Sequence, residues 1–143
     1  VKVSAPTKTV SVLSQTHIAI SFIVLILGTI VTGSGPHAGD EKVQRFGFDI
    51  RSVAILHADA VIFLMGLTIA LLVAASVTDS TKKAIYIFFG VSLAQGGVGY
   101  AQYLTGIPEL LVAIHLAGAT IFWIAAWRIR LSTVRTSQKE RDQ

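Results

Sequence analysis

Four long apolar runs separated by short polar segments dominate the hydrophobic pattern of this chain. A helix needs roughly 20 apolar residues to cross the hydrocarbon core of a bilayer. Each of the four runs is long enough, and they cover residues 12–31, 53–77, 84–104 and 110–129. The pattern therefore predicts an all-α membrane protein with four transmembrane helices.

The segments between the runs are rich in residues that end helices. TGSGPHAGD follows the first run, TDSTKK follows the second and TGIPE follows the third. The last two connections are tight and predict antiparallel neighbours, whereas residues 32–52 form the one long loop. We expect an up-down-up-down bundle over residues 1–131 and a basic cytoplasmic tail over residues 132–143.

Composition supports a membrane protein, because 52% of the residues are hydrophobic and only 14% are charged. The net charge of +4 does not point to nucleic acid, because most basic residues gather on one side of the predicted topology. The positive-inside rule places that side, with both termini, in the cytoplasm. Its nine lysines and arginines are Lys2, Lys8, Lys82, Lys83, Arg128, Arg130, Arg135, Lys139 and Arg141. We therefore expect the lipid bilayer, and no nucleic acid, as a partner.

Two histidines interrupt the second and fourth runs at matching places, in SVAILHADAVIFL and LLVAIHLAGATIF. Both His57 and His115 should lie roughly 6–8 Å below the outer helix ends. The second and fourth helices of such a bundle are diagonal, so inward-facing residues at one depth point at each other. Ionisable groups inside a membrane are functional by default, and facing imidazoles suit a haem iron with two axial histidines. We predict a haem b held by His57 and His115.

Further residues are candidate pocket contacts. Gly96, Gly99 and Gln102 lie in a small, polar stripe of the third run, with Ser92, Gln95 and Tyr103. Glycines there would admit a porphyrin or, alternatively, a neighbouring helix. In the outer loop, Arg45 and Arg51 could pair haem propionates or simply be solvated.

Three other titratable residues are weaker candidates. His17 should point inward near the inner end and bond a neighbouring helix, with no histidine partner for a second haem. His37 is expected in the outer loop, in contact with solvent. Asp59 should lie on a different helix face from His57 as a hydrated carboxylate.

Three motifs in order resemble the C-terminal half of heme A synthase, the membrane enzyme that converts haem O to haem A for cytochrome oxidases. They are VTGSGPHAGD, ILHADAVIFLMGL and AQGGVGYAQYLTGIPELLVAIHLAGA, and the resemblance runs from about Leu25 to Thr120. It implies one half of a pseudo-twofold eight-helix protein, in which His57 and His115 hold haem b. It also implies oxidation of a haem O methyl group to a formyl group in a bacterial plasma membrane, with haem O synthase and cytochrome oxidase assembly as partners.

The resemblance does not supply the parts that the family uses for catalysis. In that family the substrate haem sits in the N-terminal half, beside an acidic residue and often a cysteine pair. This chain has no cysteine, and its first apolar run has no carboxylate. Because the chain starts with Val1, we expect a missing N-terminal half, or else a half-length protein that binds haem O in a second copy. The chain alone is not expected to be catalytically sufficient.

Two other functions fit the residue pattern. One is a stand-alone cytochrome b that carries electrons, which often needs a second histidine pair near the inner side. The other is a structural or assembly subunit without a cofactor, which would show no Soret band.

Overall fold

The structure is a computed structural model that describes residues 7–36, 44–74 and 77–141, with the side chains described up to residue 134. It contains four helices, and the described residues include no strand. All four are long and apolar enough to cross a membrane, which confirms the predicted all-helical class. The helices are α1 (Lys8–Ser34), α2 (Ile50–Val73), α3 (Asp79–Leu104) and α4 (Glu109–Arg141).

The helix ends differ from the predicted spans in two places. The second helix stops at Val73, four residues before the predicted end at 77. The fourth helix continues to Arg141, although we expected it to end at 129 and to be followed by a tail from 132. No glycine or proline occurs after Gly118, so nothing in the sequence ends this helix at the membrane boundary.

Side chains at three helix starts satisfy backbone N–H groups that have no partner within the helix. Thr7 accepts from the N–H of Val10, Asp49 from Ser52 and Thr78 from Thr81. The tight α3–α4 connection turns at Gly106, whose φ of 80° lies in the left-handed region that glycine adopts without strain. The TGIPE segment is therefore a turn, as predicted.

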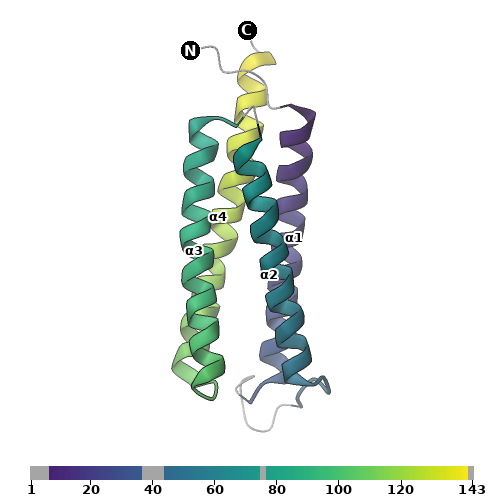
Figure 1. The fold of residues 1–143 in the computed structure, drawn as a ribbon, viewed down its shortest axis with the longest axis vertical. Coiled ribbons are helices and arrows are strands. Elements are labelled where there is room, and N and C mark those ends of the chain that lie inside the picture. Colours follow the sequence, from purple (N-terminus) through teal and green to yellow (C-terminus); the bar gives the residue numbers. More distant parts are fainter. Residues whose placement is uncertain (1–6, 37–43, 75–76, 142–143) are drawn as a thin grey trace.

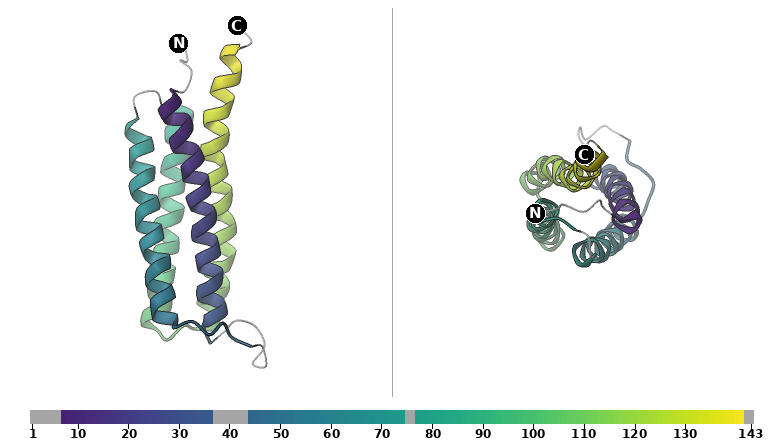
Figure 2. Two further views of the ribbon diagram at one scale, coloured as in Figure 1. Left: turned by 90° about the vertical axis from the view of Figure 1, so that its right-hand side faces the viewer. Right: turned by 90° about the horizontal axis from the view of Figure 1, so that it is seen from above.

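The helices form an up-down-up-down bundle. Around the ring, α1 packs on α2 and α4, while α3 packs on α4 and more sparsely on α2 (Figure 2). The start of α1, the α2–α3 connection and the end of α4 lie together, and we call this the inner end (Figure 1). The α1–α2 and α3–α4 connections lie at the opposite, outer end. As predicted, α2 and α4 are diagonal partners.

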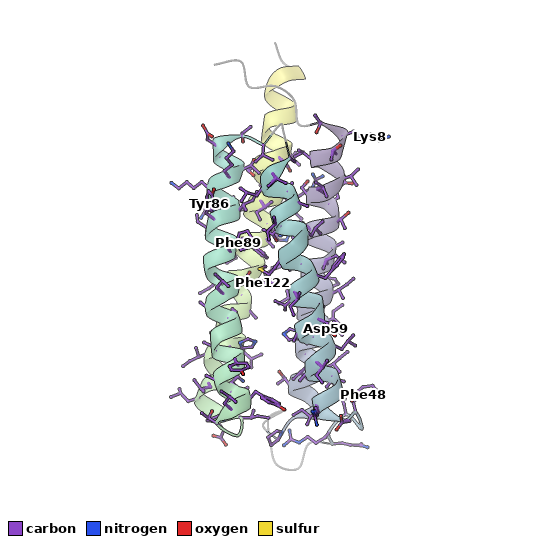
Figure 3. All side chains as sticks on the ribbon, viewed as in Figure 1. Lys8, Phe48, Asp59, Tyr86, Phe89 and Phe122 are labelled. Carbon is purple, nitrogen blue, oxygen red and sulfur yellow. The ribbon has the colours of Figure 1, made fainter. Side chains whose placement is uncertain are left out.

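Fully buried helical residues are confined to the inner half of the bundle. The buried residues of each helix lie between two limits: Val10 and Val24 on α1, Leu64 and Leu71 on α2, Thr81 and Ser92 on α3, and Gly118 and Thr133 on α4. Phe122 lies inside the bundle, near the middle of its length (Figure 3). In the outer half, no described helical residue is fully buried. The tightly packed core therefore lies in the inner half, and side chains in the outer half are at most partly buried.

The buried positions follow the spacing of a left-handed bundle. On α1 they are Val10, Ser14, His17, Ser21 and Val24, which alternate four and three residues apart. This 3.5-residue repeat keeps one stripe directed at the neighbouring helices. Extending each stripe outward therefore identifies the residues that face the less filled half.

Candidate functional site

The two predicted histidines lie on the interior stripes of their helices. On α2 the steps of three and four residues run from Leu71 through Thr68, Leu64 and Val61 to His57. On α4 the corresponding steps run from Ile129 through Ala125, Phe122 and Gly118 to His115. Both imidazoles therefore face the interior of the outer half, and both are partly buried.

The structure brings the two imidazoles to the same region from diagonal helices. They are close enough for a charge on the ring of His115 to act on His57. Since α2 and α4 are not neighbours in the ring, the rings approach each other across the bundle interior. This is the arrangement that the matched depths predict.

Each imidazole packs against a glycine of the adjacent helix. A Cβ at Gly28 of α1 would lie 3.3 Å from Cε1 of His57, and one at Gly99 of α3 would lie 3.4 Å from Cε1 of His115. The carbonyl group four residues before each glycine also interacts with the ring, from Val24 and Gln95 respectively. In both the α1–α2 pair and the α3–α4 pair, a histidine therefore lies beside a glycine and a carbonyl group of the adjacent helix.

One nitrogen of each imidazole lacks a hydrogen bond of ordinary geometry. Nδ1 of His57 and Nδ1 of His115 are buried and have no partner among the described residues. The carbonyl groups of Val24 and Gln95 act on the two rings, but neither Nδ1 forms a hydrogen bond of full geometry. Buried polar atoms of this kind cost free energy unless a partner satisfies them.

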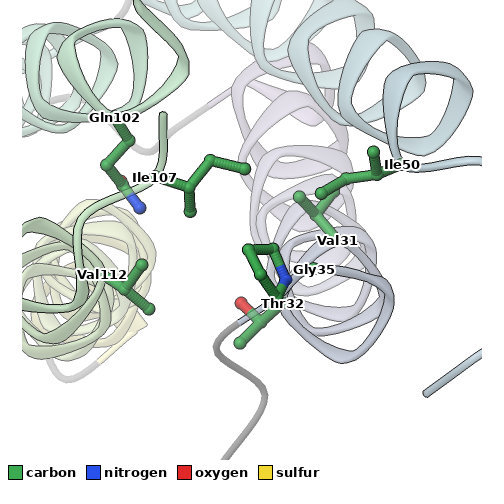
Figure 4. A pocket seen from close by; sticks show the side chains of 8 residues that line it. Val31, Thr32, Gly35, Ile50, Gln102, Ile107 and Val112 are labelled. Carbon is green, nitrogen blue, oxygen red and sulfur yellow. The ribbon is translucent and has the colours of Figure 1, made fainter. Parts of the chain in front are cut away.

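A small cavity of about 50 Å³ lies at the outer end, where all four helices contribute to its wall (Figure 4). Gln102 and Thr32 supply polar groups, and the remaining wall is mostly apolar: Val31, Gly35, Pro36, Ile50, Ile107 and Val112. The cavity is too small for a porphyrin by itself. It lies about one helical turn outward from the histidine pair, and neither histidine lines it.

The two arginines at the outer end, Arg45 and Arg51, differ in their contacts and in their exposure to solvent. Arg45 donates from Nη2 to the carbonyl group of Pro36 at 2.6 Å, and its Nη1 is buried without a partner among the described residues. Because Pro36 lines the cavity, Arg45 lies near this cavity, and its Nη1 could donate a further hydrogen bond. Arg51 is exposed at the start of α2, and no contact in the structure links it to the cavity.

The predicted polar stripe of α3 divides into two faces. Ser92, Gln95, Gly99 and Gln102 follow the interior stripe, and Gln95 packs directly against Gly118 of α4. Gly96 is exposed, with open space where a Cβ would be, and Tyr103 is exposed as well. Gly96 therefore does not face the interior, because it lies one residue away from the stripe.

The remaining titratable candidates lie away from the histidine pair. His17 is fully buried in the inner half, and its Nε2 hydrogen-bonds Thr68 of α2 at 3.1 Å, as expected for a residue that ties two helices together. Asp59 is exposed on α2, on the face opposite His57 (Figure 3). His37 lies outside the described residues.

The donor set suits a haem better than a bare metal ion. Among residues 7–36, 44–74 and 77–141, no group of three or more His, Cys, Asp or Glu side chains could hold a metal. Structural zinc needs four protein ligands and catalytic zinc needs three. A porphyrin supplies its own equatorial nitrogens, so two axial imidazoles are enough.

Sequence reasoning did not place Gly28 beside His57 or Gly118 beside Gln95. Gly28 lies on the α1 stripe, four residues after Val24, and Gly118 lies three residues after His115 on α4. The 4-3 spacing that identifies the core would have identified both. Comparison of the chain with protein-family models, with curated proteins and with solved structures finds no match.

Proposed function

We propose that the outer half of this bundle binds a haem b, with His57 and His115 as the axial ligands of the iron. One observation carries the proposal. Two imidazoles from diagonal helices face the interior of the outer half of the bundle, where no described helical residue is fully buried. Haem supplies one-electron redox chemistry when it is bound, and its potential depends on the ligands and on the polarity of the pocket.

The side chains around the rings have separate tasks in this proposal. Gly28 and Gly99 let the Cε1 edge of each ring lie close to the neighbouring helix. The carbonyl groups of Val24 and Gln95 would accept from Nδ1–H after a small rotation of each ring, which leaves Nε2 for the iron. Nη1 of Arg45, which has no partner among the described residues, could donate a hydrogen bond to a haem propionate at the outer end of the bundle.

Ligation by two histidines leaves no open position for oxygen or substrate, so this unit suits electron transfer. Together with the motif resemblance, this supports the cofactor half of a heme A synthase that oxidises the methyl group of haem O. We place it in a bacterial plasma membrane with both termini cytoplasmic, in a pathway that supplies cytochrome oxidase. A two-haem electron carrier fits less well, because His17 has Thr68 as its partner and no second imidazole.

Replacement of either ligand tests the proposal. His57→Ala and His115→Ala should each abolish the low-spin haem b spectrum of the purified protein, because one axial ligand is lost. His37→Ala is the matched control and should retain the spectrum. A normal low-spin spectrum in His115→Ala would exclude ligation by this pair.

A second test concerns sufficiency. The chain alone should bind haem b but should not convert haem O, because its described residues offer one matched histidine pair and no carboxylate beside that pair. The purified protein with haem O and a reductant should yield no hydroxylated haem and no haem A by chromatography. Formation of either product would favour a self-associating enzyme in which a second copy binds the substrate.

A further inference from the structure

The inner end of the bundle carries more positive charge than its own acidic side chains balance. The basic side chains described there are Lys8, Lys82, Lys83, Arg128 and Arg130. Among the side chains described up to residue 134, Asp79 is the one acidic group at this end, and it pairs with Lys82 at 3.7 Å. The remaining cations have no acidic partner within the described residues, so this end can attract an anion from outside the chain.

Arg130 is held in a defined orientation between α4 and α1. Its Nη1 donates to Oγ of Ser14 at 3.1 Å, and Ser14 is buried. Ser14 donates its own hydrogen to the carbonyl group of Ser11 at 3.0 Å, so it accepts from Arg130. Nε and Nη2 of Arg130 have no partner among the described residues and are not enclosed by the protein. The guanidinium group is therefore fixed by one corner and presents its other donors at the surface.

The level of Arg130 along the bundle makes an unpaired charge costly. Ser14 lies six residues after Lys8, the first residue of α1, which corresponds to about 9 Å. α1 has 27 residues. It is therefore about 40 Å long, whereas the hydrocarbon core of a bilayer is about 30 Å thick. With the bundle centred in a bilayer, the guanidinium group lies close to the edge of the hydrocarbon, where a permanent charge needs a partner and lipid phosphates are the nearest anions.

A strip of partly exposed aromatic rings leads to Arg130 along the line where α1 and α4 pack side by side (Figure 2). Trp123 of α4 contacts Phe22 of α1 and Trp127 of α4, with 5.9 Å between ring centroids in each pair. Phe22 is 53% exposed and Trp127 is 42% exposed, so the strip is open to the surroundings. Arg130 follows Trp127 by three residues and lies on the same face of α4. The strip therefore joins an apolar surface to a cation at its inner end.

We infer that the face formed by Phe22, Trp123, Trp127 and Arg130 binds one anionic phospholipid of the bilayer. The lipid phosphate accepts hydrogen bonds from Nε and Nη2 of Arg130, and one acyl chain lies against the aromatic rings. Arginine suits this role because its planar fork donates two parallel bonds to a phosphate. The other basic residues of the inner end favour a lipid of net negative charge over one whose head group also carries an ammonium. This inference does not depend on the proposed haem function.

Fluorescence quenching by brominated lipids tests the lipid site, because Trp123 and Trp127 are the two tryptophans of the chain. The full chain is reconstituted in phosphatidylcholine vesicles with a minor fraction of brominated phosphatidylglycerol or the same fraction of brominated phosphatidylcholine. Each sample is compared with its unbrominated counterpart, so quenching by any bound haem cancels. Phosphatidylglycerol should occupy the site roughly fivefold more often, which is the effect of one basic residue on an anionic lipid at a membrane surface.

Equal quenching by the two brominated lipids would overturn the proposal. If neither lipid quenches the tryptophans, another protein surface, such as a second copy of this chain, covers the face, and the proposal is wrong as well.

Two arginines of α4 provide a matched pair of variants. Arg130→Gln should abolish the preference for phosphatidylglycerol, with far-UV circular dichroism as the check on folding. Arg128→Gln removes the same charge from the same end of the helix, but Arg128 is exposed on a different face and the preference should remain. An equal loss in both variants would show general attraction to a basic surface and would overturn the site.

Arg130→Lys keeps the charge but cannot form two parallel bonds to a phosphate, so it should retain only part of the preference. This variant tests the site even if Arg130→Gln does not fold. A preference equal to that of the wild type would exclude the proposed contact between the guanidinium group and the phosphate.

Discussion

At the scale of single residues, the position of a glycine on the helix surface decides whether it faces the bundle interior or the outside. Gly99 lies against the ring of His115, whereas Gly96, three residues earlier, has only open space around it. Composition cannot distinguish two glycines in the same run. The interior stripe can, because Gly99 is four residues after Gln95 and seven after Ser92, and both of these face inward.

This difference yields a matched pair of variants. Gly99→Ala adds a methyl group 3.4 Å from Cε1 of His115, which is van der Waals contact and leaves the ring no freedom to turn toward α3. Because the proposed ligation needs a small rotation of that ring, haem affinity should fall by roughly a few-fold. Gly96→Ala should bind haem as the wild type does. Equal affinities in a haem titration would show that Gly99 does not position the ligand.

At the scale of helices, the boundaries depend on local capping more than on hydropathy. The apolar run of the second span begins at 53, but α2 starts at Ile50 because Asp49 accepts hydrogen bonds from the N–H and the hydroxyl group of Ser52. Likewise, α3 starts at Asp79, five residues before its apolar run, because Thr78 caps it. Polar residues that flank a span therefore add a helical turn that a hydropathy pattern cannot show.

The Asp49 cap predicts a pH dependence at the start of α2. Hydrogen bonds from Ser52 hold the pKa of the Asp49 carboxyl group below its ordinary value of 3.8. The cap therefore contributes its full stability above pH 3.8, and the contribution is lost as the pH falls below that value toward the lowered pKa. Asp49→Ala should speed amide hydrogen exchange at Ser52 and Val53 about fivefold at neutral pH. Unchanged exchange would mean that the cap does not hold this helix end.

At the scale of the whole molecule, the bundle has a closed inner half and a less filled outer half. Phe88, Phe122 and Ile129 close the inner half, while glycines and histidines occupy the corresponding outer positions. The stable half can hold the four helices in register, so the ligand pair need not contribute to folding. We therefore expect the His57→Ala and His115→Ala proteins to fold.

The asymmetry of basic residues predicts the orientation of the whole bundle. Ser80 and Thr105 are exposed at opposite ends, and the chain has no cysteine of its own, so each can be replaced by a single reactive thiol. A membrane-impermeant reagent added outside the cell should label Thr105→Cys and not Ser80→Cys. Labelling of Ser80→Cys and not of Thr105→Cys would show that the topology is inverted and that the proposed haem site lies near the cytoplasm.

Sequence alone determined the number of helices, their alternation and the two interior histidines. Each of these depends on local composition, on spacing along one helix, or on the short connections that make neighbours antiparallel. The tertiary structure decided what sequence could not: that Gly28 packs against His57 and Gly118 against Gln95, that Gly96 has open space around it, and that His17 leaves Nδ1 unpaired while Nε2 contacts Thr68. These facts depend on which faces of different helices meet and how their side chains interlock, and no single stretch of the chain contains that information.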